Sequence, residues 1–144
     1  TDSDFLFSFF LLHLFWCGNE NEIDKVFADI VDKYDEECSM FVRMKFEKIL
    51  NLLKKWNIDY SAYNIEGVSH LYALWYLALY IDNNQIDADD ICDKMNIFYR
   101  NLRSDKTIPQ TVIYQQSMQS ASRSKSARKK RINAILTYLE YEKL

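Results

Sequence analysis

The residues best suited to bind a charged ligand lie in one short, serine-rich segment near the end of the sequence. Residues 123–144 contain 7 Lys/Arg and 2 Asp/Glu, whereas residues 1–122 contain 11 and 19, so the overall net charge of −3 conceals a basic end. Six of these cations fall within nine residues: Arg123, Lys125, Arg128, Lys129, Lys130 and Arg131. Guanidinium and ammonium groups clustered in this way can neutralise phosphates.

Serines alternate with the first of these cations, directly before a predicted helix. Ser122, Ser124 and Ser126 offer hydroxyl groups there. The start of a helix also presents unpaired backbone N–H groups and the positive end of the helix dipole, and both bind anions. We therefore predict that the six cations, with Ser124 and Ser126, contact nucleic-acid phosphates. No aromatic residues are interleaved to stack on bases, so we expect backbone contact rather than sequence recognition.

Two other interpretations of the basic segment stay open. A run of charges is usually a solvated helix face, and its cations could pair with the acidic remainder of the chain. Cations at a helix start oppose the helix dipole, so the placement is locally unfavourable unless something compensates for it. A membrane-surface helix is the third interpretation, but its apolar face would be narrow and needed by the core. We expect no membrane partner.

Residues that could support catalysis do not form a complete motif. His13 and His70 lie in apolar segments and are expected to be packed rather than catalytic. HExxH, GxSxG, GxGxxG and Walker-type motifs are absent, and two glycines could hardly build a phosphate-binding loop. The three cysteines are widely spaced, which disfavours a zinc site or a disulfide framework and favours a reducing compartment.

Acidic clusters are the remaining candidates for metal ligands. The DADD sequence at residues 87–90 resembles the start of a calcium loop but lacks the required Gly and closing Glu. A helix cap explains it better. The clusters at residues 20–22 and 35–37 could in principle hold a divalent ion. We expect no catalytic residue, no metal site and no cofactor.

The elements that position these residues are predicted to be helices. Gly (2) and Pro (1) are scarce and 49% of the residues are hydrophobic, which favours helices joined by short connectors. Predicted helices cover residues 4–17, 21–38, 39–56 with Ser39 as cap, 68–81 as the central core helix, 87–102 with Asp87 as cap, 111–122, and a final segment through Leu139. The prediction is an all-α fold: one compact bundle of about six to seven helices, with residues 1–144 as a single domain.

Apolar spacing identifies the buried faces. Residues 91, 95, 98 and 102 fall on one face of their helix, and residues 132, 135, 136 and 139 on one face of the last. Residues 103–110, which contain the single proline, form the predicted loop between them.

The segment Phe5–Trp16 is apolar on nearly every side and rich in aromatic residues. The apolar run from Phe5 to Cys17 is about 13 residues long, too short to span a bilayer, and Asp2 and Asp4 precede it where a secretory signal would be positive. We therefore expect a cytoplasmic protein. Because the chain opens with Thr1, we also expect a C-terminal fragment of a larger protein. The Phe5–Trp16 helix would dock on a missing domain or on a second copy.

The segment SASRSKSARKKRINAIL, residues 120–136, resembles the closing segment of the GmrSD-like (ParB-like nuclease-associated) restriction and phage-defence proteins. In that family a serine-rich run leads into a basic helix, as residues 124–132 do here, and HLYALWYLAL at residues 70–79 resembles the preceding core helix. The resemblance covers about half of the chain. It implies a helical accessory domain of a bacterial defence protein that supports DNA engagement or contacts between domains. The family's catalytic motif has no counterpart here, so no catalytic residue is carried over.

These observations lead to one expected function and one alternative. The expected function is a non-catalytic helical module that contacts nucleic-acid phosphates through the basic segment. The alternative is a protein-interaction or structural domain that docks through its apolar first helix.

Overall fold

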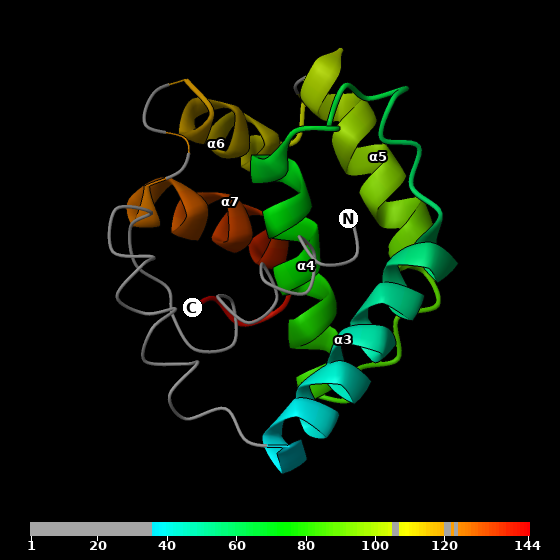
Figure 1. Cartoon of the computed structure of the whole chain (residues 1–144). Helices are drawn as coiled ribbons and strands as arrows, with labels where there is room; N and C mark the ends of the chain where they lie inside the picture. Colours follow the sequence, from blue (N-terminus) through cyan, green and yellow to red (C-terminus); the bar gives the residue numbers. More distant parts are fainter. Residues whose placement is uncertain (1–35, 105–106, 120–121, 123) are drawn as a thin grey trace.

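Five helices make up the described part of the chain, and four of them surround the apolar helix α4 (Val68–Asn83). The computed structural model describes residues 36–104, 107–119, 122 and 124–144. The helices are α3 (Glu36–Trp56), α4 (Val68–Asn83), α5 (Ile91–Arg103), α6 (Pro109–Ser117) and α7 (Lys125–Tyr138). In Figure 1, α4 runs through the middle, with α3 and α5 on one side and α6 and α7 on the other. The predicted all-helical bundle is confirmed for these residues, while the helices predicted over 4–17 and most of 21–38 lie outside them.

Helix α4 is the centre of the core, as its nearly continuous apolar sequence predicts. Its buried side chains include Ala73, Leu74, Trp75, Leu77 and Ala78, and it packs against both α3 and α7. A helix that is apolar on most sides must be covered on most sides, which explains its central position. No helix in the described part of the chain is both long and apolar enough to cross a membrane.

Helix α3 corrects one predicted boundary. We predicted a break before Ser39, but α3 runs without interruption from Glu36, so Ser39 lies inside it. Neither Gly nor Pro separates the two predicted helices, and the backbone therefore has no local reason to leave the helical conformation. The predicted end is confirmed: Asn57, next after the last helical residue, adopts a left-handed conformation with φ 48°. Asparagine tolerates this conformation at helix ends.

An ion-pair cluster connects α3 to α4. Lys45 and Lys48 both contact the carboxylate of Asp82, whose side chain is only 6% exposed; the Lys48 Nζ to Asp82 Oδ1 distance is 2.9 Å. Lys45 also donates to Oδ1 of Asn83 at 2.6 Å. Burial alone would raise the pKa of Asp82, but the hydrogen bonds from the two lysines outweigh it and hold the pKa below its ordinary value. The carboxylate is therefore charged and holds the two helices together.

Helix α5 begins later than predicted. Asp87 does not cap it; the helix starts at Ile91, and Asp90 occupies the cap position without a side-chain cap hydrogen bond. The carboxylate of Asp90 instead pairs with Lys94, one turn along, at 2.8 Å. The predicted core face is confirmed, because the following side chains are all buried: Ile91, Met95, Phe98 and Leu102.

A polar network around Asn101 organises the corner between α5 and α6. Oδ1 of Asn101 accepts hydrogen bonds from the backbone N–H of Ile108 at 2.9 Å and from Oγ1 of Thr111 at 3.2 Å. Helix α6 begins at Pro109, whose ring suits the first helical position because no N–H is needed there. The loop predicted over residues 103–110 is shorter in the structure, because Arg103 still belongs to α5 and Pro109 and Gln110 belong to α6. The helix after it covers residues 109–117 rather than 111–122.

Candidate nucleic-acid interface

Helix α7 begins within the serine-rich run, and Ser124, which was predicted to contact a phosphate, is the cap of its first turn. The Ser124 side chain accepts a hydrogen bond from the backbone N–H of Ala127 at 3.1 Å. The other backbone N–H groups of the first turn have no acceptor within the helix. No acidic side chain lies in that turn to occupy the positive end of the helix dipole. The start of α7 is therefore suited to an anion.

Arg131 does not face solvent, and this corrects the prediction that it contacts a phosphate. Its residue is 1% exposed, and Nη1 donates to the carbonyl oxygen of Ser117 at 3.1 Å. Nη2 donates to the carbonyl oxygen of Ser122. Burial lowers the pKa of Arg131. Its guanidinium group connects α7 to the end of α6 and cannot reach an external ligand while it does so.

Arg128 is also buried, at 8% exposed, and its guanidinium carbon lies 5.0 Å from the centre of the Tyr72 ring. This cation–π contact joins α7 to α4. The prediction that Arg128 reaches a phosphate is corrected for the same reason as for Arg131. Both arginines share a helix face with Ile132 and Ile135, because they lie one turn before these apolar residues. The helical period places both arginines on the core side of α7, but a long side chain can extend from there to solvent, so it does not by itself predict that the guanidinium groups are buried.

Three of the residues predicted to contact phosphates lie on the outward face of α7. Ser126, Lys129 and Lys130 are exposed. With Asn133 and Thr137 they follow the i, i+3, i+4, i+7, i+11 spacing of a single helix face. The structure therefore brings two of the predicted lysines together with the predicted Ser126 and separates them from the two arginines.

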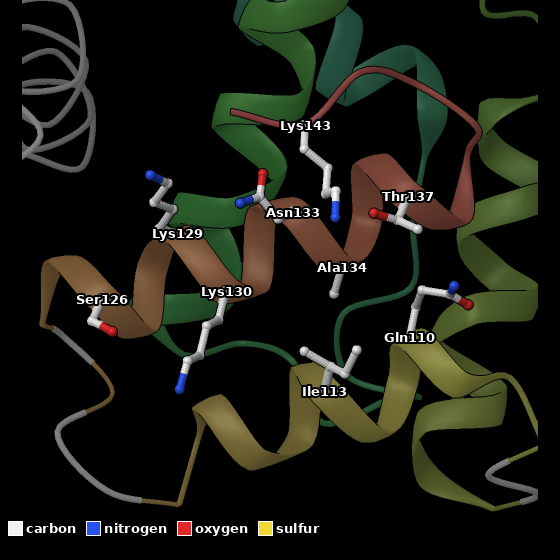
Figure 2. A pocket seen from close by; sticks show the side chains of 9 residues that line it. All are labelled: Gln110, Ile113, Ser126, Lys129, Lys130, Asn133, Ala134, Thr137 and Lys143. Atoms are coloured by element: carbon white, nitrogen blue, oxygen red, sulfur yellow. The ribbon is translucent and has the colours of Figure 1, made fainter.

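This face forms one side of an open groove, which we call the lysine groove, with a volume of about 440 Å³. Figure 2 shows α7 along one side and α6 along the other, with Ile113 and Ala134 directed toward each other between them. Lys143, from the segment after α7, reaches over the helix beside Thr137 (Figure 2). The lining residues are Gln110, Ile113, Ser126, Lys129, Lys130, Asn133, Ala134, Thr137 and Lys143.

The described charged side chains that line the lysine groove are all positive. Among the residues that the structure describes, its lining contains three lysines and no acidic residue. Helix α6 contains no charged side chain at all, so the wall opposite α7 supplies no counter-charge. Three ammonium groups that share a groove repel one another, and an anion bound there would relieve that repulsion.

Lys143 is the charged residue of the groove lining that the sequence analysis did not predict. It lies beyond the end of α7, 13 positions after Lys130, and no helical spacing relates the two. A hydrogen bond from the backbone N–H of Leu144 to Oδ1 of Asn133, at 2.9 Å, holds this segment against α7. The contribution of Lys143 therefore depends on tertiary structure.

The other predicted site residues have less direct roles. Lys125 is the first helical residue of α7, whereas Arg123 lies outside the described residues. The hydroxyl oxygen of Ser124 is occupied as the helix cap. Of these three residues, only Ser124 has a described side chain, and it does not line the lysine groove.

His70 is packed, as predicted for a histidine in an apolar segment. Its residue is 6% exposed, and Nδ1 lies 2.7 Å from the hydroxyl oxygen of the buried Tyr114. Burial, together with the nearby charges of Arg103 and Arg131, lowers the pKa of His70 to about 4. The ring is therefore neutral at pH 7 and joins α4 to α6.

Potential metal ligands are scattered in the part of the chain that the structure describes. No group of three or more His, Cys, Asp or Glu residues that could hold a metal ion occurs there. Of the DADD residues, Asp90 pairs with Lys94, and Asp89 lies 3.6 Å from Lys55. The acidic cluster at residues 20–22 lies outside the described residues, as does His13.

No protein-family model, curated protein sequence or solved structure matches this chain.

Proposed function

We propose that this chain is a non-catalytic helical module that binds nucleic-acid phosphates through the lysine groove. The observation that supports this most directly is the lining of the groove, which contains Lys129, Lys130 and Lys143 and, in the described part of the chain, no acidic residue. Ser126 adds a hydroxyl group near the start of α7, where the helix dipole also favours an anion. The proposed set is smaller than the sequence predicted, because Arg128 and Arg131 are buried.

Polyanion binding must come from this local charge, because the whole chain has a net charge of −3. Each phosphate that a lysine neutralises releases condensed counterions, so binding should weaken steeply as salt is added. Two or three lysines support only modest affinity. An accessory role within a larger assembly, such as the bacterial defence proteins that residues 120–136 resemble, fits an interface of this size.

The test is a fluorescence-anisotropy titration of labelled DNA at several salt concentrations, with a Lys129→Ala/Lys130→Ala variant. We expect weaker binding to every DNA sequence and a decrease of about two in the slope of log K against log salt. Both lysines are exposed, so the variant should fold normally.

The matched control is Lys54→Ala/Lys55→Ala, which removes the same charge from exposed positions at the end of α3. It should bind DNA almost as the unmodified protein does. Equal losses in the two variants would mean that total charge alone drives binding, and the proposed interface would be wrong.

The alternative function is a protein-interaction domain, and a second groove favours it. This groove, about 370 Å³ in volume, lies between α3 and α4 and is largely apolar, with lining residues Leu50, Leu53, Lys54, Asn57, Ile58, Tyr60, Leu71 and Trp75. Such a surface suits an apolar helix, for which the Phe5–Trp16 segment of a second copy is our candidate. Light scattering that shows a monomer over a wide range of concentrations would count against this alternative.

A further inference from the structure

We infer that the lysine groove takes single-stranded nucleic acid, with one unpaired base placed over Ile113 and Ala134. This inference rests on the proposed function and makes it more specific. It starts from an arrangement that phosphate binding alone does not explain: the groove lining combines three lysines with the apolar side chains of Ile113 and Ala134.

The cations lie toward the two ends of the groove. Lys129 and Lys130 belong to the N-terminal half of α7, and Lys143 lies beside Thr137 near its C-terminal end (Figure 2). Residues 129 and 137 are separated along the helix axis by about 12 Å, from a rise of about 1.5 Å per residue. A single strand laid along this length would bring phosphates near the lysines at both ends, with an unpaired base between them.

The centre of the groove offers a surface for a base. Ile113 is 45% exposed, although its side chain is large and apolar, and it faces Ala134 across the groove (Figure 2). An unpaired base presents a flat, weakly polar face, and covering Ile113 with it would remove apolar area from water. None of the described lining residues is aromatic, so this contact should be tolerant of base identity.

Two amide side chains flank this surface. Gln110 lies on α6 and Asn133 on α7, and both line the groove. Oδ1 of Asn133 already accepts the hydrogen bond from the backbone N–H of Leu144, which leaves its NH₂ group directed to donate elsewhere. Amide groups can pair with the exposed edge of an unpaired base, whereas in a duplex the Watson–Crick edge is already paired.

The position of α7 disfavours a duplex. A helix that reads double-stranded DNA enters a major groove about 12 Å wide and must therefore protrude from its domain. Helix α7 is instead flanked by α6 on one side and by the Lys143 segment on the other (Figure 2). A volume of about 440 Å³ lies at the lower end of the range for small-ligand pockets, which suits a nucleotide unit better than a double helix.

The experiment compares three labelled probes of equal length at low salt: an oligothymidylate strand, an abasic strand with the same phosphates, and a DNA duplex. We expect the oligothymidylate to bind more tightly than either of the others. An Ile113→Ser variant should weaken oligothymidylate binding about fivefold, because it removes apolar area that the base covers, and should leave abasic-strand binding unchanged.

Val112→Ser is the matched control, since Val112 is the neighbouring residue of α6, is 40% exposed and does not line the groove. It should bind all three probes as the unmodified protein does. Equal binding of oligothymidylate, abasic strand and duplex would overturn this inference but leave the proposed function standing. If none of the three probes binds, both the inference and the proposed function fail.

Discussion

Nη1 of Arg131 donates a hydrogen bond to the carbonyl oxygen of Ser117, the last residue of α6, across a distance of 3.1 Å. The last carbonyl groups of a helix have no partner within it and carry the negative end of the helix dipole. A buried guanidinium group at this position satisfies those carbonyls and is itself stabilised by them. One residue of the basic segment thus connects the two helices that form the lysine groove.

Replacement of Arg131 by Ala should therefore destabilise the fold. The carbonyl groups of Ser117 and Ser122 would lose their donor while buried or half-buried, so we expect the free energy of unfolding to fall by about 3 kcal/mol. Urea denaturation followed by circular dichroism measures this change.

Lys130→Ala is the matched control, because it removes the neighbouring cation from an exposed position. Its free energy of unfolding should stay within about 0.5 kcal/mol of the unmodified value. If the two variants lose the same stability, Arg131 does not hold α6 and α7 together.

The cap of α7 gives a second prediction. Ser124→Ala removes the oxygen that accepts the hydrogen bond from the N–H of Ala127, so the free energy of unfolding should fall by about 1 kcal/mol. Ser124→Asp keeps an acceptor and should restore most of the loss. Thermal unfolding of both variants, beside an exposed Ser126→Ala control that should behave as the unmodified protein, would show whether the cap contributes.

The buried His70 predicts how stability depends on pH. Its pKa is about 4 in the folded chain and about 6.5 when unfolded, so between these values only the unfolded chain binds the proton. The stabilisation of the folded chain that comes from keeping His70 neutral is complete above about pH 6.5. It is lost as the pH falls toward 4, and the free energy of unfolding falls by roughly 3 kcal/mol.

The measurement is urea denaturation at a series of pH values for the unmodified protein and for His70→Gln, which retains a partner for Tyr114. The variant should be less stable at pH 7 and should lose less stability between pH 6.5 and 4. Parallel pH profiles for the two proteins would show that His70 is not the group responsible.

The sequence alone was enough to predict the elements in which local pattern and tertiary environment agree. The apolar sequence of α4 predicted a central helix, and the spacing of residues 91–102 predicted the buried face of α5. Asn57 marked a helix end, because asparagine tolerates the left-handed conformation. Pro109 marked the break between α5 and α6, although it is itself the first residue of α6. The starts of α3 and α5 were predicted wrongly from Ser39 and Asp87. Residues such as serine and aspartate often cap helices, but they also occur at positions where no helix begins.

The candidate site shows what only the tertiary structure decided. The sequence located a cluster of cations but not which of them face solvent. That division follows from the partners that other helices supply: the Tyr72 ring of α4 covers Arg128, and the carbonyl groups at the end of α6 hold Arg131. Lys143 joins the groove through a backbone hydrogen bond to Asn133. Charge in a sequence predicts attraction to an anion, but burial by distant residues determines which charges can reach one.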